Sequence, residues 1–154
     1  MRWSKLKQRI EDRFADKLQG RLQIFETLHR MGHNHRLGEI WLTLEKERIF
    51  STSDMNGWQR MNKYLSEGNS YDQAYEKTAM EGTLPVYQSN KMLFETLNMT
   101  IDDMLESRAV LVRGLGIVDA RCGLRRLKRM EADIKAEHSF IQRLYVERIS
   151  KAIT

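Results

Sequence analysis

The chain has 154 residues and a formal net charge of +5, and 41% of its residues are hydrophobic and 31% charged. These proportions are typical of a globular protein and argue against a disordered or collagen-like chain. No apolar run approaches the ~18 residues of a membrane span, and we expect no signal peptide because no apolar stretch follows the first basic residues. Cys122 is the single cysteine. We therefore expect no disulfide within the chain, no cysteine-based zinc cluster and a reducing, cytoplasmic location.

The N-terminal segment predicts a helix with one apolar face. Apolar residues recur at helical spacing from Trp3 to beyond Phe14, and Gly20 supplies the C-terminal stop. We expect Trp3, Phe14 and, further along the chain, Trp41 and Leu115 to be largely buried.

A β-rich stretch follows this helix. The pattern changes to runs of β-branched, aromatic and aliphatic residues, which are separated by a glycine-bounded loop and a charged turn. Three strands that pack a helix on one face can be stable, whereas two strands alone are marginal. We expect a small antiparallel sheet with strands at about 22–31, 40–44 and 48–51, a polar loop at 32–38 and a turn at 45–47.

The second half of the chain predicts helices throughout. Ser53 and Thr100 are suitable N-caps, and Ser70 with Gln73 forms a capping-box pattern. The expected helices are 53–65, 70–81, a helix that opens at Ser89 or Asn90 and breaks near Asn98, 100–106, 108–129 and 133–153. Glycines inside the helix 108–129 indicate close helix approach or a kink. The predicted fold class is α+β. We expect a single domain over 1–154, with a helix and a β-meander in 1–52 and a helical part in 53–154.

Basic residues are concentrated in two segments of the chain. Residues 1–21 carry a net charge of +4 and residues 108–129 carry +6, whereas residues 22–107 carry −5. Two explanations stay open. The basic helices lie against the acidic part of the same fold, or they form a surface for an anionic partner.

The segment 108–129 carries the candidate site residues. Arg121, Arg125 and Lys128 share one face if the segment is a single helix, and such a face can neutralise phosphates. It has no interleaved aromatic residues for base stacking, and arginine is also favoured at protein interfaces. The candidates for binding a protein partner or an anion are Arg113, Arg121, Arg125, Arg126, Lys128 and Arg129.

Asp119 is the single acidic residue of this segment and has no basic residue three or four positions away. We expect a structural clasp between Asp119 and Arg121, formed within the fold or across a dimer, with Arg121 partly buried. The basic residues that follow Arg121 should be more exposed, namely Arg125, Arg126, Lys128 and Arg129.

His33 and His35 form an H-x-H pair at the tip of the expected hairpin, where two imidazoles at this spacing could share a metal ion. A closed site needs further ligands, and the available residues, His29, Glu39 and His138, are not fixed by spacing. We therefore expect a solvated loop, and we assign no metal, cofactor or catalytic residue. The sequence also has no nucleophile elbow, zinc-protease motif or P-loop.

The start at residues 3–7 and the stretch from Leu115 to Leu127 resemble parts of a family of small bacterial proteins of uncharacterised activity. The start Trp3-Ser4-Lys5-Leu6-Lys7 is similar to the family's N-terminus. The stretch from Leu115 to Leu127 is similar to the pattern A-x-x-x-L-D-R-R-x-G-x-R-x-L. The matching places are Asp119, Arg121, Gly123, Arg125 and Leu127, while Ala120 and Cys122 stand at variable places. The resemblance implies a bacterial cytosolic origin and no particular activity.

We therefore expect a non-catalytic bacterial accessory protein that acts through protein–protein interaction, either with a protein partner or as a homo-oligomer, and without a membrane partner. The alternative is a nucleic-acid-binding protein that uses the basic helix 108–129. A second alternative is a metal-dependent enzyme around His33 and His35. The salt dependence of binding distinguishes the protein-binding hypothesis from the nucleic-acid hypothesis, because phosphate binding weakens steeply with ionic strength.

Overall fold

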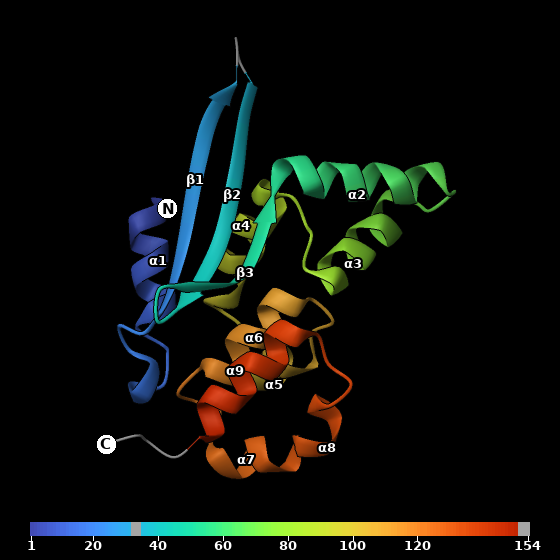
Figure 1. Cartoon of the computed structure of the whole chain (residues 1–154). Helices are drawn as coiled ribbons and strands as arrows, with labels where there is room; N and C mark the ends of the chain where they lie inside the picture. Colours follow the sequence, from blue (N-terminus) through green and yellow to red (C-terminus); the bar gives the residue numbers. More distant parts are fainter. Residues whose placement is uncertain (32–34, 151–154) are drawn as a thin grey trace.

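The computed structural model describes residues 1–31 and 35–150, and their side chains except those of residues 29–31, 35 and 36. The fold is α+β, with an N-terminal helix, a three-stranded antiparallel sheet and a helical second half (Figure 1). The fold class expected from the sequence is therefore confirmed. None of the helices in the described part of the chain combines the length and the hydrophobicity that crossing a bilayer requires.

The elements begin with α1 and end with α9. The first part contains α1 (Trp3–Glu11), the 3-10 turn η1 (Asp16–Leu18) and the strands β1 (Leu22–Met31), β2 (His35–Leu44) and β3 (Glu47–Ser53). The second part contains α2 (Asp54–Ser66), α3 (Tyr71–Glu81), α4 (Val86–Thr96), α5 (Ile101–Glu106), α6 (Val110–Val118), α7 (Leu124–Arg129), α8 (Glu131–Ile134) and α9 (Ser139–Ile149).

The first helix is shorter than its apolar pattern predicts. α1 ends before Phe14, which lies in an isolated antiparallel bridge with Asp119. The N–H of Ala15 donates a hydrogen bond of 2.8 Å to the carbonyl of Val118. These backbone groups bond to a distant segment, so they do not continue the helix.

The two faces of the sheet differ in burial. Ile40 and Leu42 of the central strand β2 are fully buried. Trp41, between them, is only half-buried and stacks on Phe25, with ring centroids 5.5 Å apart. Trp41 is therefore less completely buried than the sequence predicts, because successive side chains of a strand point to opposite faces and Trp41 lies on the face away from the core. The guanidinium carbon of Arg48 lies over the Trp41 ring, 4.3 Å from its centroid.

Local capping signals place several element ends correctly. Ser53 caps α2, Ser70 and Gln73 form the capping box of α3, and Thr100 caps α5. The turn between β2 and β3 has φ values of 51° at Glu45 and 68° at Lys46, the left-handed geometry of a tight hairpin turn.

α4 begins earlier than the sequence predicts, at Val86 rather than at Ser89 or Asn90. Pro85 is its N-cap residue, and the N–H of Val86 donates to the Asp54 carboxylate at 2.9 Å. The Asp54 side chain of α2 thus accepts a hydrogen bond from an N–H that has no partner within α4. Because this contact joins two distant segments, the sequence near Val86 does not predict it.

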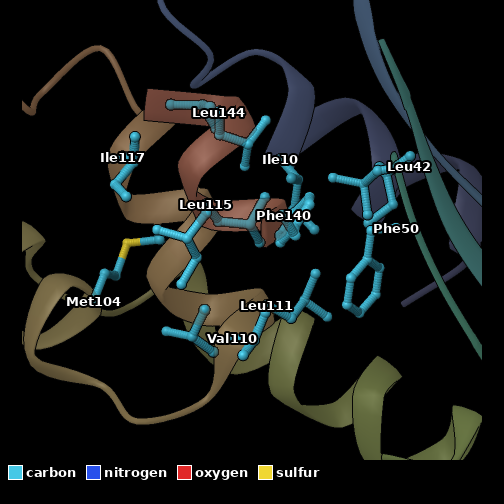
Figure 2. Close-up of a cluster of buried hydrophobic side chains, with 14 of the residues drawn as sticks. Ile10, Leu42, Phe50, Met104, Val110, Leu111, Leu115, Ile117, Phe140 and Leu144 are labelled. Carbon is cyan, nitrogen blue, oxygen red and sulfur yellow. The ribbon is translucent and has the colours of Figure 1, made fainter. Parts of the chain in front are cut away.

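The hydrophobic core joins the buried face of the sheet to α6 and α9. Eight of the nine residues of α6 are buried. Figure 2 shows Phe50 of β3 facing Phe140 of α9, with Leu115 of α6 beside them; the two phenyl centroids are 4.8 Å apart. A Cβ at Gly114 would lie 2.6 Å from the Phe140 ring, so this glycine lets α6 and α9 approach closely. Phe14 and Leu115 are buried as expected, whereas Trp3 is half-buried at the core margin.

We expect Trp41→Ala to cost less stability than Leu42→Ala. Truncation of the fully buried Leu42 should lower the free energy of unfolding by about 2–5 kcal/mol. Trp41 keeps solvent on one side, so its truncation should cost about 1–3 kcal/mol. Urea unfolding of the two purified variants measures both values. A larger loss for Trp41→Ala than for Leu42→Ala would contradict the assignment of the two sheet faces.

Candidate functional site

The continuous helix expected over 108–129 is wrong, because a turn separates α6 from α7. Asp119 pairs with Phe14, and the N–H of Ala120 donates to the carbonyl of Arg13 at 2.8 Å. The backbone after α6 therefore bonds across the fold to the N-terminal segment, which ends the helix.

This turn divides the candidate residues into separate groups. Arg113 belongs to α6, Arg121 lies in the turn, and α7 carries Arg125, Arg126, Lys128 and Arg129. The helical face expected to unite Arg121 with Arg125 and Lys128 does not exist, because these residues are not on one helix.

Asp119 and Arg121 bind each other within the turn. Oδ1 of Asp119 accepts hydrogen bonds from the backbone N–H of Arg121 at 2.9 Å and from its Nε at 3.1 Å, and Oδ2 accepts from Nη2 at 2.9 Å. The Asp119 side chain is 2% exposed and that of Arg121 is 44% exposed. The hydrogen bonds from Arg121 to Asp119 raise the pKa of the Arg121 guanidinium. This pair lies within one chain and does not require a dimer.

Two further arginines cap the C-termini of helices. Arg13 donates to the carbonyls of Thr96 at 3.0 Å and Leu97 at 2.6 Å, where α4 ends. Arg113 donates to the carbonyl of Leu105 in the last turn of α5. The last carbonyls of a helix have no partner within it and carry the negative end of its dipole, so a guanidinium there is stabilising.

Arg148, which is buried, bonds to a carbonyl at the C-terminal end of α6. It is 7% exposed, and it donates from Nε to the carbonyl of Ile117 at 2.9 Å and from Nη2 to the carbonyl of Cys122. Burial lowers the pKa of Arg148, although an arginine stays charged at neutral pH. Lys17 in turn donates to the carbonyls of Arg148 and Ser150 at the end of α9.

Ion pairs engage two further candidate residues besides Arg121. Arg113 also pairs with Glu137 at 2.5 Å, and Arg126 pairs with Asp102 at 2.5 Å. The other basic residues of α7 are exposed, and their side chains form no hydrogen bond or ion pair with any described residue, namely Arg125, Lys128 and Arg129. The basic surface that is open to a partner is therefore much smaller than the sequence indicates.

The metal hypothesis at His33 and His35 stays a prediction. His33 lies outside the described residues, and His35 is described in its backbone alone, at the start of β2. Among residues whose placement is described, no three His, Cys, Asp or Glu side chains are grouped to hold a metal ion. His138 is exposed and caps α9, with its Nδ1 accepting from the N–H of Phe140 at 3.1 Å.

Cys122 is fully buried, and its burial raises the pKa of its thiol. Its carbonyl accepts a hydrogen bond from Arg148. A buried thiol with a raised pKa does not present a thiolate at neutral pH, so Cys122 packs as a small apolar residue.

Sequence reasoning missed a stripe of exposed apolar side chains on α2. Met55 is 64% exposed, Trp58 40% and Leu65 37%, and their spacing places them on one side of the helix. We call these three residues the α2 stripe. Gly57 and Met61, on a neighbouring side of α2, are buried. Figure 1 shows α2 and α3 extending together away from the sheet and the other helices. The sequence signal for this stripe is that α2 has more apolar residues than are needed to cover one buried face of a helix.

Sequence reasoning also missed a groove along β3, because its walls come from distant segments. The groove has a volume of about 340 Å³. It is lined by Arg48, Ile49, Phe50 and Ser51 of β3 and by Glu81, Gly82, Thr83 and His138. We call it the β3 groove. A second cleft, of about 270 Å³, shares His138 and is lined further by Arg108, Arg113 and Glu137.

Comparison with protein families matches residues 2–149 to the SF0329 protein family. The match covers nearly the whole chain, so the chain belongs to that family. Neither a comparison with curated proteins nor one with solved structures finds a match. The resemblance to a protein family that the sequence indicates is thus confirmed at the level of the family.

We expect Arg121→Ala to destabilise the protein more than the double change of Arg126 and Arg129 to alanine. Without Arg121, the Asp119 carboxylate keeps its burial and loses both side-chain donors, which should cost about 1–3 kcal/mol. Arg126 forms an exposed ion pair with Asp102, worth about 0–1 kcal/mol. Chemical unfolding of the two variants tests this difference. A neutral Arg121→Ala would show that the pair contributes nothing to the fold.

Proposed function

We propose that this chain, as a member of the SF0329 protein family, is a non-catalytic protein that acts by binding another protein. The observation that carries the proposal is the α2 stripe, Met55, Trp58 and Leu65. Tryptophan and methionine are enriched at protein interfaces, and tryptophan often carries much of the binding energy. A polar partner such as a phosphate chain gains nothing from these side chains, whereas an apolar protein surface buries them.

The internal use of basic charge supports the same conclusion. Arg13, Arg113 and Arg148 are bonded to helix carbonyls, and Arg121 is bonded to Asp119. The fold thus uses part of the positive charge of the sequence internally, without an anionic partner.

A cytoplasmic, bacterial setting is part of the proposal. Cys122 is a free, buried thiol, which is typical of proteins in reducing compartments, and the sequence resembles small bacterial proteins. The partner is a different protein or a second copy of this chain, and the experiment below separates these two.

Nucleic-acid binding is the second candidate, and one observation favours it. Arg125, Lys128 and Arg129 are exposed on α7 without a bonded partner among the described residues. Three cations on one short helix give a limited phosphate footprint, and α7 carries no aromatic residue for base stacking.

The double variant Met55→Gln/Trp58→Gln tests the proposed function. Glutamine keeps helix propensity and removes the apolar surface. Because Trp58 is 40% exposed and so partly covered by its neighbours, we expect the variant to stay folded with a loss of about 1–3 kcal/mol. Tyr87→Gln on α4 is the matched control, because Tyr87 is 76% exposed and lies outside the stripe. Proteins that co-purify with the tagged chain from its source cells are identified, purified and titrated by calorimetry. Sedimentation velocity of the chain alone detects self-association.

We expect the double variant to bind the purified partner, or a second copy, at least about tenfold more weakly, and the control to bind normally. Equal affinity of all three proteins would overturn the role of the α2 stripe. The purified chain could instead retain nucleic acid that dissociates with added salt. If changing Arg125 and Arg129 to alanine abolishes that retention, nucleic-acid binding becomes the favoured function.

A further inference from the structure

Side chains of α1 close one part of the outer edge of β1. The N–H of Ile24 donates to the Glu11 carboxylate at 2.8 Å, and the carbonyl of Ile24 accepts from Lys7 Nζ at 2.7 Å. Lys7 and Glu11 also pair with each other at 2.7 Å. Because both backbone polar groups of Ile24 are bonded to α1, no further strand can pair with β1 at this residue.

The same edge is open nearer the C-terminal end of β1. In an antiparallel sheet, successive residues direct their N–H and C=O groups to alternate sides of the strand, so Glu26 and Leu28 face away from β2 as Ile24 does. Their backbone groups form no hydrogen bond with any described residue on that side. Leu28 is 57% exposed, and Figure 1 shows β1 continuing past α1 with no helix beside it on the side away from β2. This part of the edge is therefore free to pair with another strand.

Two charged residues of β1 lack a favourable partner within the chain. Glu26 is half-buried and accepts a hydrogen bond from Asn90 Nδ2 at 3.0 Å, but it forms no ion pair with any described residue. Burial raises the pKa of its carboxyl group. Arg30 lies opposite Arg36 of β2 in the sheet register, and like charges at opposite places weaken strand pairing. An added strand is therefore favoured if it brings a cation opposite Glu26 and an anion opposite Arg30.

A second copy of β1 meets both conditions at one register. The open part of the edge follows Ile24 and ends with the strand at Met31, so Leu28 is its midpoint. An antiparallel pair about a twofold axis at Leu28 sets this residue against Leu28 of the second copy. The same register sets Glu26 opposite Arg30 of the second copy, and the symmetry repeats this pair on the other side. A shift of two residues in either direction places Leu28 opposite a charged residue instead.

We propose that β1 pairs antiparallel with the β1 of a second copy of this chain over residues 25–31, joining the two three-stranded sheets into one. Leu28 buries apolar surface at the centre of the pair, and two pairs of Glu26 with Arg30 flank it. A strand of an unrelated protein can also bond the open backbone groups, but β1 itself supplies the matching charges at the matching places. The interface uses a surface other than the α2 stripe, so it goes beyond the proposed function.

The test exchanges the charges of the proposed pair and measures self-association of the full chain. The variants are Glu26→Arg, Arg30→Glu and the double exchange Glu26→Arg/Arg30→Glu. Arg125→Glu is the matched control, because Arg125 is exposed on α7. Two short strands form a small interface, and small interfaces are weak. Sedimentation velocity is therefore measured up to about 0.5 mM, where a dissociation constant of about 0.1 mM still gives mostly dimer.

We expect the original chain and Arg125→Glu to dimerise equally. Each single exchange turns two attractive pairs into two repulsive ones, so it should raise the dimer dissociation constant at least about fivefold. The double exchange restores the attraction and should return the constant to within about threefold of the original. Arg30→Glu also removes the like-charge pair with Arg36, so dilute Arg30→Glu should unfold at no lower urea concentration than the original chain.

Hydrogen exchange of the Leu28 amide gives a second measurement that needs no variant. In the dimer this amide donates to the second copy, so it should exchange more slowly in concentrated than in dilute protein. The Ile24 amide, which is bonded to Glu11, should exchange equally in both. A chain that stays monomeric at about 0.5 mM, a folded double exchange that dimerises no better than the single ones, or Leu28 exchange that does not depend on concentration would each overturn the proposal.

Failure here is distinguishable from failure of the proposed function. The double variant Met55→Gln/Trp58→Gln keeps residues 25–31 unchanged, so it should dimerise as the original chain does. If that variant loses self-association while Arg30→Glu keeps it, the α2 stripe forms the dimer and the β1 proposal is wrong. If no chain self-associates but the α2 variant still loses its protein partner, the β1 proposal alone is wrong.

Discussion

The end of α6 at Val118 leaves helix carbonyls in the protein interior, and the rest of the fold depends on how they are bonded. Arg148 donates to the carbonyls of Ile117 and Cys122, and the N–H of Ala15 donates to that of Val118. An unpaired buried carbonyl costs about 1–3 kcal/mol. The N-terminal segment, the turn after α6 and the last helix therefore meet at one point, and none of the three can move without leaving a polar group unbonded.

This arrangement changes how the concentration of positive charge in the sequence is interpreted. A concentration of arginine suggests a surface for anions, yet the guanidinium groups of Arg13, Arg113 and Arg148 lie at the C-terminal ends of helices. Short helices have many ends in a small volume, and each end presents carbonyls that a cation can bond. The surface features that remain for a partner are the α2 stripe, the open edge of β1 and the exposed cations of α7. Two of these three suit a protein better than a nucleic acid.

Local signals in the sequence predict the fold well where the structure is decided locally. The caps at Ser53, Ser70 and Thr100 and the tight turn at residues 45–46 lie as predicted. Contacts between distant segments account for the differences: the bridge of Phe14 to Asp119 shortens α1 and divides the segment 108–129. For the candidate site, Asp119 and Arg121 could be named because they are close in sequence. The β3 groove could not, because β3, residues 81–83 and His138 come together only in the fold.

The most direct test of the central claim is the stability of Arg148→Met, measured by urea unfolding beside the control Arg125→Met. Methionine keeps much of the side-chain volume and removes the donors to Ile117 and Cys122. We expect Arg148→Met to lose about 2–5 kcal/mol of unfolding free energy. Arg125, exposed on α7, should change it by less than about 0.5 kcal/mol. Equal stability of the two variants would contradict the claim that buried basic side chains hold this fold together.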